Sequence, residues 1–196
     1  MIDRNRFQEI ESRFGNFASW AVWAEVDKRP KSKMEDISIF KDPSLPYTLE
    51  QLHNDFVLLG LNISTIDIVE PLSNFHGQNG EVYKLRYALQ GTPLWGSYMT
   101  DIIKDFKEAD SIKILKYFKQ NPQNLKDHIE KFEDELSVLG GKRPTLVALG
   151  HGVYEILKES FDHSHSIIRI PHYAARVSKE IYRDQVAKML REAHVM

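Results

Sequence analysis

The stretch "DFVLLGLN" (residues 55–62) decides the fold. It is a short apolar run that reaches a glycine and ends at an asparagine. A run of this kind, bounded by turn residues, is typical of a strand buried on both faces of a parallel sheet. We therefore predict a central strand here, with Gly60 and Asn62 at its carboxyl end.

Three later segments have the same character. The further predicted strands are "LWGSYMTDII" (94–103), "PTLVALG" (144–150) and "SIIRIPH" (166–172). Apolar residues spaced three and four apart predict helices at 4–14, within 121–141, at 151–161 and at 174–194. Strands that alternate with helices indicate a parallel sheet covered on both faces. The predicted fold is a three-layer α/β/α structure with a short, mostly parallel four-stranded sheet.

The chain shows no internal repeat and no low-complexity tract. Its 196 residues are enough for one domain with a sizeable core, so we predict a single domain over 1–196 with an N-terminal helical extension over about 1–50. Residues 64–93 form a long polar connection in this interpretation. Connections of that length are uncommon inside a compact domain and are often functional.

Composition narrows the possible functions. The chain has no cysteine, which excludes disulfides, thiolate nucleophiles and cysteine metal sites, and suits a reducing compartment. No apolar stretch approaches a membrane span and the N-terminus lacks an apolar signal core. We expect a cytoplasmic monomer with no membrane partner.

The charge of the chain is weaker evidence about its binding partners than the composition is about its possible functions. The net charge of −2 argues mildly against a strong non-specific nucleic-acid binder. From Arg169 onward, however, six Lys and Arg face three Asp and Glu. Either a local basic face or an ordinary solvated helix explains that excess.

Polar residues stand at the tips of the four predicted strands: Asn62, Asp101, His151 and His172. Taken singly, each has an ordinary structural explanation. Asn62 can cap a turn, and Asp101 can pair with Lys104. The carboxyl ends of parallel strands meet at one edge of a sheet, however, and that edge is where open α/β sheets bind ligands. Their convergence favours a functional site.

The order of these tips resembles the uracil-DNA glycosylase superfamily, most closely the branch with the mismatch-specific and single-strand-selective enzymes. In that branch the first strand ends in Gly-x-Asn-Pro-Gly, where this chain has "GLNIS" (60–64). The superfamily's last strand ends in His-Pro-Ser, where this chain has "IPHYA" (170–174). The segments "GSYMTDIIK" (96–104) and "LVALGHGVYEIL" (146–157) resemble the intervening motifs. The resemblance covers about residues 54–190.

The resemblance implies a role for each matching residue. Asn62 would position the attacking water, and His172 would stabilise the charge that develops on the departing base. Phe75 would stack on the flipped base and Asp101 would read it. Gly60, Ser64 and Tyr173 would complete the substrate site, and Arg169, Arg176 and Lys179 would contact DNA phosphates. No metal and no cofactor is implied.

The motifs also depart from the family pattern. Ile63 and Ser64 replace a proline and a glycine, and Tyr173 and Ala174 replace a proline and a serine. Asp101 stands where several branches have an asparagine. An asparagine can both donate and accept a hydrogen bond, whereas an ionised aspartate only accepts. We therefore expect a base that offers an amine to suit this site better than uracil does.

Three functions stay open at this point. The first is a monofunctional DNA glycosylase that hydrolyses the N-glycosidic bond of a damaged or mismatched base. The second is a non-catalytic protein on the same fold that binds a nucleobase or nucleic acid, because a fold alone does not determine an activity. The third is a hydrolase of free nucleosides or nucleotides.

Overall fold

The structure is a computed structural model of the chain and describes residues 2–27, 29–63, 68, 70–77 and 80–196. Its centre is a five-stranded sheet in the order β1-β3-β2-β4-β5. The strands are β1 (Ala18–Trp20), β2 (His53–Asn62), β3 (Ser97–Ile103), β4 (Thr145–Leu149) and β5 (Ile167–Ile170). Strands β3, β2, β4 and β5 are parallel, and β1 runs antiparallel to β3 at the edge. The predicted α/β fold with a mostly parallel sheet is confirmed.

The predicted number of strands is wrong, because β1 adds a fifth. It has three residues, all buried, inside the apolar segment "NFASWAVWAEVD", so it shows no alternation that would mark it as a strand. Strand β1 also joins part of the proposed N-terminal extension to the sheet.

Strand β2 lies in the middle of the sheet because both of its faces are apolar. Val57, Leu58 and Leu59 are fully buried. Val57 and Leu59 pack into one core cluster and Leu58 packs into the other. A strand covered on both faces reads as the continuous apolar run seen in the sequence.

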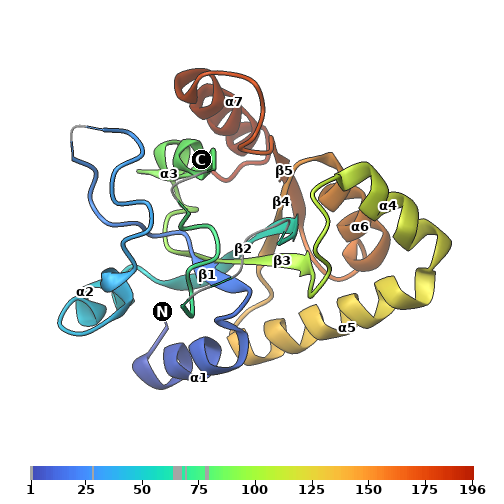
Figure 1. Cartoon of the computed structure of the whole chain (residues 1–196), viewed down its shortest axis with the longest axis horizontal. Coiled ribbons are helices and arrows are strands. Elements are labelled where there is room, and N and C mark those ends of the chain that lie inside the picture. Colours follow the sequence, from blue (N-terminus) through green and yellow to red (C-terminus); the bar gives the residue numbers. More distant parts are fainter. Residues whose placement is uncertain (1, 28, 64–67, 69, 78–79) are drawn as a thin grey trace.

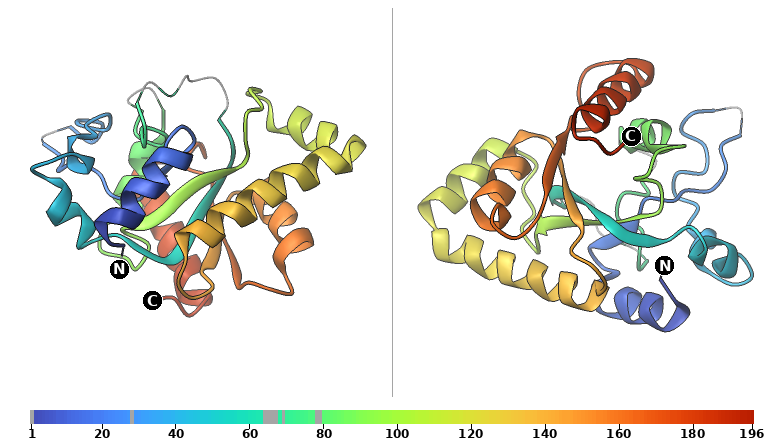
Figure 2. Two further views of the ribbon diagram at one scale, coloured as in Figure 1. Left: turned by 90° about the horizontal axis from the view of Figure 1, so that it is seen from below. Right: turned by 180° about the vertical axis from the view of Figure 1, so that it is seen from behind.

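Helices cover both faces of this sheet (Figures 1 and 2). One face carries α1 (Arg4–Phe14), α4 (Ser111–Gln120), α5 (Pro122–Leu139) and α6 (His151–Phe161). The other carries α3 (Val82–Leu89) and α7 (Lys179–Glu192). The short helices η1 (Ser38–Phe40) and α2 (Leu45–Leu49) lie beside the β1 edge.

Two helices depart from the sequence prediction. Helix α3 lies inside the segment 64–93 that we interpreted as a polar connection, and α4 was not predicted. The buried residues of α3 include Lys84 and Arg86 beside Val82 and Leu85. Two buried cations interrupt the apolar spacing, so the periodicity does not reveal the helix.

The strand order indicates at which edge of the sheet a ligand should bind. Helix α3 connects β2 to β3 on one face of the sheet. Helices α4 and α5 connect β3 to β4 on the other face. The order of the strands therefore reverses between β2 and β4, and open α/β sheets bind ligands at the carboxyl ends of the strands near such a point. Gly60 and Asp101 lie two residues before the ends of β2 and β3, and Gly150 and His172 lie just beyond the ends of β4 and β5.

Candidate functional site

Asp101 is the most deeply buried of the predicted site residues. Its side chain projects from β3, and the residue is only 3% exposed. The Asn74 side-chain amide donates a hydrogen bond of 2.9 Å to Asp101 Oδ2. Burial raises the pKa of the Asp101 carboxyl to about 6, against the opposing effects of the Asn74 hydrogen bond and the Lys104 charge. Asp101 therefore changes protonation close to neutral pH.

Phe75 is held against Asp101 in a strained backbone conformation. Its φ is 64°, in the left-handed region that residues other than glycine seldom adopt. Two hydrogen bonds fix it there. The Phe75 amide donates to Asn74 Oδ1 at 3.0 Å, and the Trp23 indole donates to the Phe75 carbonyl at 3.1 Å. Asn74 thus orients the Asp101 carboxylate and the Phe75 ring together.

Gly60 lies between these two side chains. A methyl group at this position would lie 2.2 Å from Asp101 Oδ1 and 3.3 Å from Phe75 Cζ. The absence of a side chain at Gly60 is what lets the carboxylate and the ring approach the tip of β2. The predicted grouping of Gly60, Phe75 and Asp101 is thus present.

We expect Gly60→Ala to lower the free energy of unfolding by about 1–3 kcal/mol, since overpacking at a buried contact costs that much. Urea denaturation measures the change. Gly80→Ala is the matched control, because the nearest side-chain atom there is 3.7 Å from an added methyl group. Equal stability of the two variants would show that Gly60 has room for a side chain.

Tyr173 and His172 form the other side of the site. Burial and the nearby charge of Asp101 raise the pKa of the Tyr173 hydroxyl. Tyr173 is therefore close enough to Asp101 to interact with it electrostatically. The His172 ring stacks on Tyr173 with centroids 4.2 Å apart, and its Cβ lies against Gly150. His172 is exposed, and partial desolvation by its neighbours lowers its pKa.

The hydrogen bonding of His172 indicates its tautomer. The Ala174 amide donates to His172 Nδ1 at 3.1 Å, so Nδ1 acts as an acceptor. In the neutral ring the proton is then assigned to Nε2. A neutral imidazole that presents an Nε2–H donor can stabilise a developing negative charge.

The loop that carries His172 and Tyr173 is anchored at two points. Tyr182 on α7 donates to the Pro171 carbonyl at 2.8 Å, and Lys84 on α3 donates to the Ala175 carbonyl at 3.0 Å. Lys84 is 5% exposed and also pairs with Glu81 at 2.8 Å. Its buried charge is therefore used to hold the loop on α3.

Asn62 has a structural role in addition to the predicted one. Its side-chain amide donates to the carbonyls of Phe106 and Glu108, at 2.8 and 2.9 Å, and so holds the loop after β3. Both bonds use Nδ2. Among the described residues no hydrogen bond to Asn62 Oδ1 is found.

The three predicted DNA-contacting residues do not gather into one patch. Arg169 contacts α6, where it lies 3.1 Å from His151 Nδ1 and over the Tyr154 ring. Lys179 lies on the other face of the sheet, 3.9 Å from the centre of the Tyr87 ring on α3. Arg176 is exposed in the loop between them. The predicted Ser64 lies outside the described residues.

The sequence does not reveal the roles of three residues near the site. Trp23 fixes the Phe75 backbone, and Lys84 and Tyr182 fix the His172 loop. Trp23 stands in a long aromatic segment, and the sequence suits Lys84 equally to a nucleic-acid contact or to a packed, solvated loop. Nothing local distinguishes Tyr182 from other helix residues. These contacts span roughly 11 to 91 residues of sequence, so only the fold reveals them.

Comparisons with protein-family models, with curated proteins and with solved structures found no match to this chain. Within the described residues, no group of three or more His, Asp or Glu side chains is placed to hold a metal ion. In the same residues, no helix has the length and apolar character needed to cross a bilayer. The function must therefore be argued from the geometry of the strand tips.

The Asp101 carboxyl makes a testable contribution to stability. Its pKa is raised on folding, so the fold favours the protonated form, and the stability gained is complete below about pH 4 and is lost as pH rises through about 6. A shift of this size corresponds to about 3 kcal/mol. We expect Asp101→Asn to be more stable than the wild type at pH 7–8, with the difference disappearing near pH 4. Urea denaturation across this range measures it, and a constant difference would show that Asp101 titrates normally.

Proposed function

We propose that the carboxyl edge of the sheet binds a nucleobase and hydrolyses its N-glycosidic bond in DNA. One observation carries the proposal: the Phe75 ring and the Asp101 carboxylate both approach Gly60 near the carboxyl ends of β2 and β3. A flipped base needs an aromatic surface on which to stack and a polar group that reads its edge. The four parallel strands of the sheet support the uracil-DNA glycosylase type of fold that we propose from the sequence.

The proposed reaction needs two further groups. Cleavage of a glycosidic bond develops positive charge on the sugar and negative charge on the departing base. His172 presents a neutral Nε2–H donor at the tip of β5 for the base. Asn62 presents Oδ1 at the tip of β2 for the attacking water. The proton of that water passes to solvent, because a neutral amide orients water but does not accept its proton.

Asp101 determines the proposed base preference. Above its pKa of about 6 the carboxylate only accepts hydrogen bonds, so it favours a base with an exocyclic amine. Asp101→Asn supplies a donor as well and should shift the preference toward uracil. Unchanged preference in that variant would remove Asp101 from base recognition.

Base release from a panel of oligonucleotides tests the function. The panel carries uracil, hypoxanthine, xanthine, alkylated bases and mismatches in single and double strands. Release that disappears in Asn62→Ala supports a glycosylase at this edge. Binding without release from any member supports the non-catalytic alternative on the same surface.

Salt dependence distinguishes DNA from a free nucleoside as the substrate. Contacts to phosphates release counterions, so affinity for an oligonucleotide should fall steeply as salt rises. A free-nucleoside hydrolase should respond little. Loss of Arg176 should reduce the salt slope by about one unit if this exposed side chain contacts a phosphate.

A further inference from the structure

A cavity lies at the opposite edge of the sheet from Asp101. Its walls include Gln51, just before β2, and Trp95, just before β3, so it opens at the amino ends of the parallel strands. Its volume is about 590 Å³, which is within the usual range for small-molecule sites, about 300–1,000 Å³. None of the described catalytic, substrate-binding or DNA-binding residues predicted from the sequence lines it. Trp23 belongs to both places, because it lines this cavity and also donates to the Phe75 carbonyl.

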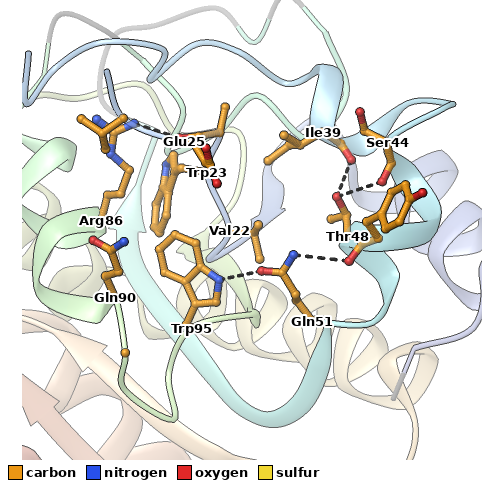
Figure 3. Close-up of a pocket in the computed structure, with 14 residues that line it drawn as sticks. Val22, Trp23, Glu25, Ile39, Ser44, Thr48, Gln51, Arg86, Gln90 and Trp95 are labelled. Carbon is orange, nitrogen blue, oxygen red and sulfur yellow. Dashed lines mark hydrogen bonds between the residues drawn. The ribbon is translucent and has the colours of Figure 1, made fainter. Parts of the chain in front are cut away.

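Two tryptophans give the cavity an aromatic wall. The rings of Trp23 and Trp95 lie 5.6 Å apart at 54° to each other. Trp23 is almost fully buried, whereas Trp95 is partly exposed and can meet a ligand. The Trp95 indole donates to Gln51 Oε1 at 2.9 Å, which fixes the ring. Figure 3 shows Trp95 between Arg86 and Gln90 on one side and Thr48 on the other.

Arg86 brings a buried cation to the same wall. It is 3% exposed, and its guanidinium donates to the carbonyls of Ala24, Pro30 and Ser32. A guanidinium has five N–H donors, and three of them are used by these bonds to described residues. Among the described residues Arg86 forms no ion pair with a carboxylate, although Asp27 is close enough to raise its pKa against the effect of burial.

The rim of the cavity is polar. Gln90 and Glu25 are exposed there, and Gln51 keeps part of its amide free beyond its bonds to Trp95 and Tyr47. The cavity thus has a stacking surface on Trp95 and hydrogen-bond donors on Arg86 and Gln51. Gln90 adds an amide that both donates and accepts, and Glu25 adds a carboxylate that accepts.

We propose that this cavity is a second binding site, for a nucleobase or nucleoside that carries an exocyclic amine. A planar heteroaromatic ring stacks on Trp95, as bases stack on aromatic side chains. Ring nitrogens and carbonyl oxygens accept from Arg86, as base edges do, and the amine donates to Glu25. The wall carries one carboxylate, Glu25, and one guanidinium, Arg86, so it has no excess of positive charge to attract a phosphate. The site is separate from the proposed glycosylase site and does not depend on it.

Calorimetric titration of the full chain tests this proposal. The probes are adenosine, guanosine, cytidine, uridine and a neutral disaccharide. We expect the three amine-bearing nucleosides to bind and uridine to bind at least several-fold more weakly. Trp95→Ala should weaken binding about 5- to 150-fold. Gln90→Ala, at an exposed side chain, tests the same site without disturbing the core.

Two further variants separate the alternatives. Glu25→Gln should reduce the preference for amine-bearing nucleosides over uridine. Asp101→Asn should leave the affinity unchanged, since it lies at the other edge. The proposal is overturned if no nucleoside binds at millimolar concentration, if only the disaccharide binds, or if uridine binds equally well. Loss of binding in Asp101→Asn would assign the ligand to the carboxyl edge and also overturn it.

Discussion

Replacing Lys104 with methionine is expected to lower the free energy of unfolding by about 3–5 kcal/mol. Lys104 and Glu135 are each 1% exposed and form an ion pair inside the core cluster beneath α5. Lys104 also donates to Thr100 Oγ1 at 2.7 Å, and the Tyr98 hydroxyl donates to Glu135 Oε2 at 2.8 Å. Without the ammonium, the Glu135 carboxylate stays buried with a hydroxyl as its partner.

Urea denaturation at neutral pH measures this effect, and a double variant controls for it. Glu135→Gln removes the charge but keeps an oxygen for the Tyr98 hydroxyl. Adding it to Lys104→Met should restore part of the lost stability, because no uncompensated charge is left. A loss below about 1 kcal/mol in Lys104→Met would mean that water reaches the pair.

If the proposed function is correct, Asn62→Ala should slow base release by about 100-fold or more, because it removes the oxygen proposed to position the attacking water. The same change also breaks the hydrogen bonds to Phe106 and Glu108, so lost activity alone does not separate the two roles. Single-turnover release and urea denaturation should therefore be measured together.

Asn62→Asp separates the two roles. The carboxylate keeps an oxygen for water but cannot donate to the Phe106 and Glu108 carbonyls. If Asn62 acts on water, this variant loses stability and retains much of its base release. If Asn62 only holds the loop, Asn62→Asp and Asn62→Ala should lose release equally, which would contradict the proposed role.

The strands of the parallel sheet could be predicted because each one is an apolar run between turn residues. The run at 56–61 shows this most clearly, since burial on both faces requires it. The predicted stripe on α5 also meets the core, with Phe132 fully buried. Helix α5 lies within the predicted range 121–141 and ends before Gly140, whose φ is 65°. Local chemistry determines these features.

The features that could not be predicted depend on contacts between distant segments of the chain. Strand β1 is too short for a pattern, and α3 hides its buried face behind Lys84 and Arg86. In the site, the rule for strand tips correctly places Asp101 beside Gly60. It does not reveal that Asn74 holds both Asp101 and Phe75, or that Asn62 holds the loop after β3. The cavity beside Trp95 could not be predicted from the sequence, because its walls come from five separate segments.

The most direct test of the proposed function measures free base and abasic strand together, by mass spectrometry, after the oligonucleotide panel is incubated with excess protein. We predict that both products appear in equal amounts with the wild type, that the released base carries an amine, and that neither product appears with Asn62→Ala on the same time scale. Intact oligonucleotides from every member of the panel, with a wild-type chain that circular dichroism shows to be folded, would contradict hydrolysis at this edge.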